Sequence, residues 1–295
     1  MPVAPDPASA PARTPAPAQT TARTPTTDAY ARLTEVHPGL TIDEPHPHEP
    51  LPHGDGWTPA AALAHDPAAL DAFLAWDDAQ VLRDYGTRAR PDVVASFALH
   101  RYAWPACLLI TVPWFLDRRV PRLPVTHVSY DRAAGRMAVR PASFACLPGD
   151  PAAAHPAARV VPDEEALRAE VREAIAEHAE PLLAAFGPRM RRRGRALWGM
   201  VTDEVVEGLW YVAHLLGEEE RARRELELLL PGATKPYAGA AAFRELTGPN
   251  GERLPTRDRA SCCMFYTVRP EDTCATCPRT CDTDRLAKLV SAAAA

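Results

Sequence analysis

The sequence predicts an α+β protein that is mainly helical, with a helical body, a small antiparallel sheet and a C-terminal cysteine-rich segment. Three observations lead to this fold class. Apolar residues recur every three or four positions through much of residues 58–230, as on one face of a helix. Residues 123–146 change to the pattern of short strands. Five of the seven cysteines lie within residues 262–281.

The chain divides into three regions by composition. Residues 1–56 are rich in Pro, Ala and Thr and contain few large apolar residues, so we expect a disordered tail that cannot bury enough surface to offset its ordering entropy. Residues 57–230 are expected to form the helical body with its β-hairpin. Residues 231–295 are expected to form the C-terminal segment that contains the cysteine cluster.

The body begins with a helical pattern over residues 58–84. Asp66 followed by Pro67 predicts a restart of the helix, because Asp caps helices well and Pro suits the first helical position. Gly86 is expected to end this helix, since glycine readily adopts the left-handed conformation of a helix C-terminus.

The most apolar stretch of the chain covers residues 93–116. A helix is expected to begin at Pro91 and to be broken or kinked at Pro105. The stretch also contains His100 and Arg101, which a membrane span would hold only at a high cost, so we expect a buried helix and no stable membrane insertion. The N-terminus has neither the basic start nor the apolar core of a signal peptide, which predicts a cytoplasmic protein.

The strand-like region is expected to be a β-hairpin. Residues 123–130 and 136–139 flank the turn at 131–135. Residues 143–147 are a further extended piece that could pair with the hairpin, and residues 148–162 are expected to be a loop rich in Pro and Ala.

The second half of the chain is expected to be helical as far as the cysteine region. Gly187 and Gly217 are expected to end the two long helices. A loop with one helical turn near Phe243 should follow. The expected helices cover residues 163–186, 188–216, 218–230 and 283–294, and the loop covers residues 231–256.

A dense basic run lies between the two long helices. It is either a solvated turn or a patch for an acidic electron donor or an anionic ligand. The net charge of the whole chain is −5, so its charge balance does not indicate a nucleic-acid partner. The run contains Arg189, Arg191, Arg192, Arg193 and Arg195.

Nucleotide-binding loops of the common kinds are absent from the sequence. There is no G-x-G-x-x-G pattern and no Walker loop, so we expect no NAD, FAD or ATP site. Any electrons that the protein uses should therefore come from another protein.

The cysteine segment has the spacing C-C-x10-C-x2-C, followed by x3-C. A C-x2-C turn brings two thiolates to one metal ion. Adjacent cysteines point in different directions and suit a two-iron cluster better than the compact tetrahedron of one zinc ion. Structural zinc, disulfides and a thiol pair that senses oxidants are the alternatives. The cysteines are Cys262, Cys263, Cys274, Cys277 and Cys281.

This segment resembles the C-terminal signature of the FhuF-type siderophore-iron reductases. The shared features are the run RASCCMFY, Pro270 and the sequence Cys274-Ala-Thr-Cys277-Pro278. The residues at 195–200, RALWGM, are also similar to a Leu-Trp-Gly helix of that family. The resemblance implies a 2Fe–2S cluster bound by Cys262, Cys263, Cys274 and Cys277. Cys281 lies outside the motif and is either a spare thiol or a replacement for one of the four.

The resemblance also implies a function. The expected activity is that of a cytoplasmic reductase, which passes one electron from the cluster to a ferric siderophore and releases ferrous iron. A ferredoxin or a flavoprotein would be the external donor. Arg257 and Arg259 are expected either to hold an anionic chelate or to tune the cluster. The alternatives are a non-catalytic iron–sulfur carrier or sensor, and a zinc-stapled siderophore-binding module.

Overall fold

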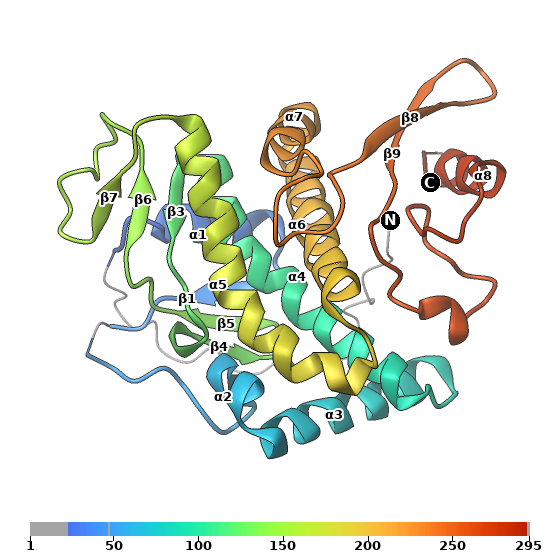
Figure 1. The fold of residues 1–295 in the computed structure, drawn as a ribbon, viewed down its shortest axis with the longest axis horizontal. Helices are drawn as coiled ribbons and strands as arrows, with labels where there is room; N and C mark the ends of the chain where they lie inside the picture. The colour runs from blue at the N-terminus through green and yellow to red at the C-terminus, as the bar shows by residue number, and fades with distance from the viewer. Residues whose placement is uncertain (1–22, 47, 294–295) are drawn as a thin grey trace.

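The structure is a computed structural model that describes residues 23–46 and 48–293. These residues form a mainly helical body with small sheets, as the sequence predicts (Figure 1). The helices are α1 (Thr27–Val36), α2 (Ala60–His65), α3 (Pro67–Tyr85), α4 (Pro91–Asp117), α5 (Glu164–Met190), α6 (Gly194–Leu216), α7 (Glu219–Leu229) and α8 (Asp282–Ala293). The strands are β1 (Thr41–Asp43), β2 (Trp57–Pro59), β3 (Arg119–Pro121), β4 (Val128–Asp131), β5 (Arg136–Val139), β6 (Phe144–Cys146), β7 (Ala158–Val160), β8 (Phe243–Thr247) and β9 (Arg253–Arg257).

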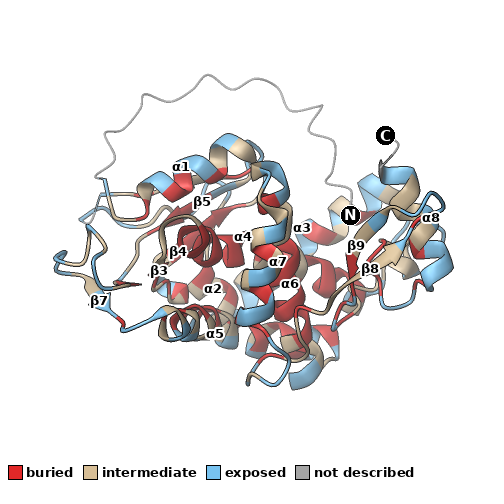
Figure 2. Cartoon of the chain, turned by 90° about the horizontal axis from the view of Figure 1, so that it is seen from above, coloured by how far each residue is buried: buried red, intermediate tan, exposed pale blue. Residues whose placement is uncertain are grey.

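Helix α4 is the centre of the body. It packs against α1, α3, α5 and α6, and the buried residues concentrate along α4 and α6 (Figure 2). Within the described part of the chain, α4 is the one helix long and apolar enough to cross a membrane, but most of its apolar window is buried inside the protein. Its composition is therefore that of a core helix.

Helix α4 corrects the expectation of a break at Pro105. The helix continues through Pro105 and Pro113 as far as Asp117. A proline inside a helix removes one backbone hydrogen bond and crowds the preceding turn. Both prolines are buried, so the packing of the surrounding helices outweighs this local cost.

The junction between α5 and α6 also differs from the expectation. Gly187 lies inside α5, which ends at Arg191 in the left-handed conformation with a φ of 53°. A Cβ atom on Gly187 would lie 3.0 Å from Cδ1 of Leu197, so this glycine allows α5 and α6 to approach closely. Gly217, with a φ of 73°, ends α6 as predicted.

The small sheets are mixed rather than purely antiparallel. Strands β4 and β5 form the predicted hairpin. The remaining strands of this sheet are β1, parallel to β5, and β2, antiparallel to β4. The extended piece that includes β6 does not join the hairpin, because it pairs with β3 and, in parallel, with β7.

The expectation of a disordered tail over residues 1–56 is wrong for residues 27–43. They form α1 and β1, with Tyr30 and Leu33 buried in the core. The hydroxyl group of Tyr30 donates to the carbonyl oxygen of Leu109 at 2.9 Å. The average composition of the region conceals this short amphipathic helix, and residues 1–22 lie outside the described residues.

The expected helical turn near Phe243 is wrong as well. Strands β8 and β9 form an antiparallel hairpin there, and the Phe243 ring packs edge-on against Trp210 of α6 at a centroid distance of 5.2 Å. The chain beyond this hairpin lies at one end of the molecule, remote from strands β1–β7 (Figure 1). The domain boundary at residues 230–231 stays a prediction.

Candidate metal centre

The cysteine segment is an irregular loop between β9 and α8, with one short 3-10 helix, η2 (Phe265–Thr267). Cys277 is buried, whereas Cys262, Cys263 and Cys274 are half-buried. Cys281 is exposed. The first four sulfur atoms therefore lie near the protein surface without being fully open to water.

The hydrogen bonds of the sulfur atoms separate Cys281 from the other four cysteines. Three of the four sulfurs accept a hydrogen bond from the residue two positions further along the chain. Cys281 instead donates its thiol hydrogen to Oδ2 of Asp284 at 3.2 Å. The donors are Met264 N to Cys262 (3.3 Å), Thr276 Oγ1 to Cys274 (3.9 Å) and Arg279 N to Cys277 (3.5 Å).

Hydrogen bonds donated to sulfur stabilise negative charge on it and tune an iron–sulfur centre. The shared spacing of cysteine and donor appears at three of the four positions named in the sequence motif, Cys262, Cys274 and Cys277. The surroundings of these residues therefore fit a thiolate-ligated metal group, and Cys281 does not share the pattern.

The same four side chains influence one another electrostatically. The pKa of Cys263 is raised to about 11, mainly by burial and in addition by the neighbouring Cys274 and Cys262, while Arg259 acts to lower it. Burial, and then repulsion from Cys277, raise the pKa values of Cys262 and Cys274. Four thiolates in this place therefore require positive charge, which bound metal ions supply.

Within the described residues, no group of three or more His, Cys, Asp or Glu side chains lies close enough together to hold a metal ion. A 2Fe–2S cluster takes four thiolates shared between two irons, which spreads the ligands more widely than one tetrahedral ion does.

Three carboxylates of α6 face the cysteine segment from the body. Asp203, Glu204 and Glu207 are buried. Asp203 accepts the backbone N–H of Ala260 through Oδ1 at 2.9 Å and that of Ser261 through Oδ2 at 2.8 Å. One side chain of the body therefore fixes the backbone just before the cysteine pair.

Arg257 completes this connection from the segment side. Its side chain is fully buried and donates to Asp203 at 2.8 Å and to Glu207 at 2.9 Å. Its Nε donates to the carbonyl oxygen of Ala241 at 3.0 Å. Although the sequence predicted a role in substrate binding, no part of this guanidinium group is open to a ligand in solvent.

Arg259 lies between the α6 carboxylates and the cysteines. Its side chain is 3% exposed, with Nε 3.5 Å from Asp203 and Nη2 3.7 Å from Glu204. Burial acts to lower its pKa, but the carboxylates and Cys263 outweigh burial, so the pKa lies well above its ordinary value and the group stays cationic. Nε and Nη2 have no hydrogen-bond partner within the described chain.

Arg259 thus has buried N–H groups that make no hydrogen bond beside the cysteine segment. They fit an anionic group at this place, because a buried donor without an acceptor is costly. The position of Arg259 matches the expected role in tuning a cluster. Its burial does not match the expected role in holding a chelate.

Close packing brings α6 to the loop. A Cβ atom on Gly199 would lie 3.2 Å from Cβ of Ser261 and 3.3 Å from the carbonyl oxygen of Ala260, so the loop needs a glycine at this position of the helix. Gly199 is the glycine of the Leu-Trp-Gly run that the sequence contains. This contact gives a physical reason for the glycine of the run.

An apolar contact holds the other side of the loop. The Phe265 ring packs against Tyr85 and Phe97, with centroid distances of 5.4 Å and 6.0 Å. The hydroxyl group of Ser96 on α4 donates to the carbonyl oxygen of Cys263 at 3.1 Å. The ends of α3 and α4 thus support the loop between the two cysteine pairs.

Sequence reasoning missed the carboxylates of α6. They lie at positions 203, 204 and 207 of a helix that otherwise shows a regular apolar stripe. Three acidic residues inside such a stripe were the available signal, because acidic side chains are rarely buried unless they are paired.

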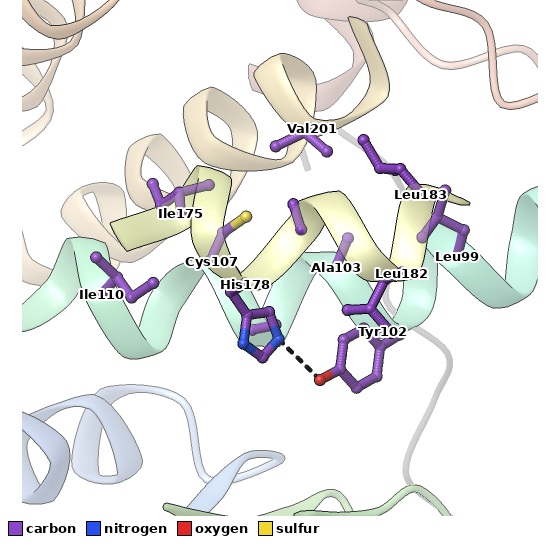
Figure 3. A pocket seen from close by; sticks show the side chains of 12 residues that line it. Leu99, Tyr102, Ala103, Cys107, Ile110, Ile175, His178, Leu182, Leu183 and Val201 are labelled. Carbon is purple, nitrogen blue, oxygen red and sulfur yellow. Dashed lines mark hydrogen bonds between the residues drawn. The ribbon is translucent and has the colours of Figure 1, made fainter. Parts of the chain in front are cut away.

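Two hollows of the protein lie away from the cysteine segment. A cavity of about 20 Å³ lies between α4, α5 and α6, where His178 and Tyr102 are hydrogen-bonded (Figure 3). It could hold a single water molecule. A shallow surface hollow of about 600 Å³ is lined by Arg122 and by Glu173, Glu177 and Glu180 of α5. None of the segment's cysteines lines either hollow.

Residues 259–279 match the family model described as the FhuF 2Fe-2S C-terminal domain. No curated protein matches the chain. The matched residues include Cys262, Cys263, Cys274 and Cys277 and exclude Cys281. Residues 259–279 therefore belong to the FhuF 2Fe–2S C-terminal domain family, and the cofactor of this segment is a 2Fe–2S cluster.

Proposed function

We propose that this protein is a cytoplasmic reductase that transfers one electron to a ferric siderophore and releases ferrous iron. We further propose that Cys262, Cys263, Cys274 and Cys277 are the cluster ligands. The proposal depends mainly on one observation. The family match contains all four cysteines, and the sulfur atoms of three of them accept hydrogen bonds in a common spacing.

The chemistry requires a change in the charge of the substrate iron. Hydroxamate and catecholate oxygens are hard ligands that favour Fe³⁺ over Fe²⁺. One electron converts Fe³⁺ to Fe²⁺, which reduces the electrostatic attraction of the oxygens for the metal. When bound, the 2Fe–2S group supplies electrons one at a time.

The protein residues position this electron transfer. Asp203 and Arg257 hold the loop against α6, and buried Arg259 supplies positive charge that eases the addition of an electron. Three of the four sulfurs are half-buried, so a chelate at the surface can come close to them.

Exposed arginines beside the loop are suited to receive the chelate. The guanidinium carbon of Arg279 lies 4.0 Å from the ring centroid of Tyr266, and that of Arg269 lies 6.0 Å from that of Tyr85. Guanidinium groups stacked on aromatic rings offer positive charge and flat surfaces. These side chains replace Arg257 and Arg259 as our proposed chelate contacts.

The first experiment is anaerobic purification, followed by measurement of iron, sulfide and zinc and by visible spectra before and after dithionite. About two irons and two sulfides per chain with a bleaching band are expected. Ferrous iron release from ferric hydroxamate and ferric catecholate chelates is then measured with a Fe²⁺ trap.

The outcomes separate the alternatives. A cluster that is reduced but releases no ferrous iron from either chelate would indicate a carrier or sensor. Stoichiometric zinc in a colourless protein would indicate a zinc-stapled binding module.

A further inference from the structure

The turn between α5 and α6 presents a concentration of positive charge that the site description does not use. We call Arg191, Arg192, Arg193 and Arg195 the basic turn. Three of them are exposed and Arg192 is half-buried. Within the described chain none of the four has an acidic partner, whereas the neighbouring Arg189 pairs with Asp71 at 2.5 Å.

Helix stability explains only part of this charge. Arg191 is the C-cap of α5, where the negative end of the helix dipole favours a cation, but Arg193 is the N-cap of α6, and Arg195 lies in its first turn. The N-terminus of a helix carries partial positive charge, so cations there are unfavourable. The arginines also repel one another, in a chain whose net charge is −5. Their charge is therefore better explained by a ligand or a partner.

The basic turn is close to the cysteine loop. Gly194 begins α6, and Gly199 contacts Ala260 and Ser261. Five residues of α-helix span about 7.5 Å along the axis, so the turn lies about one and a half helical turns from the start of the cysteine loop.

The shape of this surface favours a protein partner over a small chelate. Small ligands bind in concave sites that enclose most of their surface. The basic turn is an exposed connection between two helices, and its arginines line neither of the two hollows described above. Electron-transfer proteins, in contrast, form small and weak interfaces that depend on complementary charge.

We propose that the basic turn is the docking surface for an acidic one-electron donor protein. The donor binds by charge complementarity beside Cys262. One electron then leaves the donor and enters the 2Fe–2S group, and no covalent bond forms or breaks. This inference depends on the proposed function only in requiring that the electron come from outside the chain.

The test compares two triple variants of the full chain with intact clusters. R191E/R193E/R195E reverses the exposed charges of the basic turn and leaves Arg192 in place. R23E/R32E/R159E makes the same change in net charge at exposed arginines of the N-terminal region and β7. Iron and sulfide content is measured first in each protein.

Flavodoxin, an acidic protein with a spectrum distinct from that of the cluster, is the probe. Its oxidised form is titrated to obtain Kd, and its reduced form is mixed rapidly to follow bleaching of the cluster without any ferric chelate. Photoreduced 5-deazariboflavin, an uncharged reductant, is the control.

Electrostatic steering typically changes association rates by 10- to 1,000-fold. We expect R191E/R193E/R195E to lower the flavodoxin-driven rate at least about tenfold at an ionic strength of about 0.01 M and to weaken binding in parallel. Its rate with 5-deazariboflavin should match that of the unaltered chain, and R23E/R32E/R159E should retain both rates.

Equal flavodoxin rates in the two triple variants would overturn the proposal, as would an equal loss with both reductants. The unaltered protein gives an independent test. Its flavodoxin rate should fall as ionic strength rises from about 0.01 M to about 0.15 M, because the screening length falls from about 30 Å to about 8 Å. A flat dependence would overturn the docking surface. Ferrous iron release driven by 5-deazariboflavin tests the reductase function separately.

Discussion

The helical body and the cysteine segment are held in place by different forces. Around α4 the interior is mainly apolar, and Trp114, Phe115 and Leu108 are fully buried there. The body also buries ion pairs, such as that of Asp77 with Arg101 and Arg132. The cysteine segment depends on buried charged groups. Arg257 and Arg285 are almost fully buried, and Arg285 donates to Asp258 at 2.7 Å and to the carbonyl oxygen of Cys277 at 3.3 Å.

This difference suggests which region needs its cofactor. Apolar burial stabilises a core without any ligand. Buried ion pairs contribute little net stability, because each charge is desolvated, but the loss of one partner is costly. We therefore expect the body to fold without iron and the cysteine segment to respond to the loss of metal or of a single charge.

Replacement of a proposed cluster ligand should give the largest difference between the two regions, because it should affect the cysteine segment and leave the body folded. Cys274→Ser should abolish the cluster and the release of ferrous iron, because serine lacks the soft thiolate that iron–sulfur clusters prefer. Iron and sulfide content and the visible spectrum measure the cluster. The far-ultraviolet circular dichroism of the body should change little.

Cys281→Ser is the matched control. Cys281 donates to Asp284 and lies outside the matched residues, so this variant should retain the cluster. If Cys274→Ser released iron from ferric chelates at the normal rate, the assignment of this ligand would be wrong.

Loss of a buried charge should also affect the two regions differently. Asp203→Asn removes the negative charge from a group that contacts Arg257, Ala260 and Ser261. Breaking a buried ion pair typically costs about 3–5 kcal/mol. Hydrogen exchange should therefore rise across residues 258–285, with faster cluster loss, while α4 and α5 stay protected.

Asp71→Asn makes the same substitution at an exposed ion pair with Arg189. Its cost should be within about 1 kcal/mol, as for other surface pairs. If the two variants exchanged hydrogen equally, the buried carboxylate would not be what holds the segment.

The folding stability of the body should depend on pH, because the body buries a histidine, His178. His178 donates through Nδ1 to the carbonyl oxygen of Leu123 at 2.7 Å, and its Nε2 accepts from the Tyr102 hydroxyl at 2.9 Å. Burial lowers its pKa from 6.5 to about 4. The unfolded chain therefore binds the proton more readily between these two values, and folding stability should fall as pH falls from about 6.5 to about 4.

One pKa unit corresponds to about 1.4 kcal/mol, so the full effect is about 3 kcal/mol. Urea unfolding at several pH values measures it. His178→Gln should show a shallower fall over this pH range than the unaltered chain. Identical slopes would show that another group causes the acid sensitivity.

The smallest expected effect is that of one added methyl group at the contact between the two regions. In Gly199→Ala the new Cβ lies 3.2 Å from Ser261 and must displace the loop or the helix. Overpacking typically costs about 1–3 kcal/mol, offset by about 1 kcal/mol from the higher helix propensity of alanine. The melting temperature and the electron paramagnetic resonance spectrum of the reduced protein should both shift.

Gly194→Ala is the control, since a Cβ atom there meets nothing within 4 Å. It should leave the spectrum unchanged and stability equal or slightly higher. A spectral shift of equal size in both variants would contradict a specific contact between Gly199 and the cysteine loop.

Local signals in the sequence were sufficient for much of the helical body. Asp66 and Pro67 start α3, and Gly86 and Gly217 end α3 and α6 as predicted. Each of these features depends on the conformational preference of one residue or on a side chain that reaches its own backbone. Such preferences are properties of neighbouring residues and can be recognised without the fold.

Local signals failed where distant packing determined the outcome. Pro105 should have broken a helix, and Gly187 should have ended one, but both lie inside long helices that surround the core. Strands β8 and β9 were missed for a different reason, because they form a local hairpin whose connection at residues 248–252 contains the turn sequence Pro-Asn-Gly, a signal that the prediction of a loop with one helical turn did not use. Propensity is a weak signal that tertiary contacts override.

The cysteine spacing predicted a metal-binding segment, and the family resemblance, not the spacing, selected four of its five cysteines as the expected ligands of a 2Fe–2S cluster. Only the tertiary structure placed Asp203, Glu204 and Glu207 beneath that segment and buried Arg257 and Arg259 against them. These residues come together from α6 and β9 and from the loop that follows β9, about 50 positions apart in the chain, as in the pair of Arg257 with Glu207. Burial and pairing at that separation are set by how whole helices pack, and no local pattern specifies them.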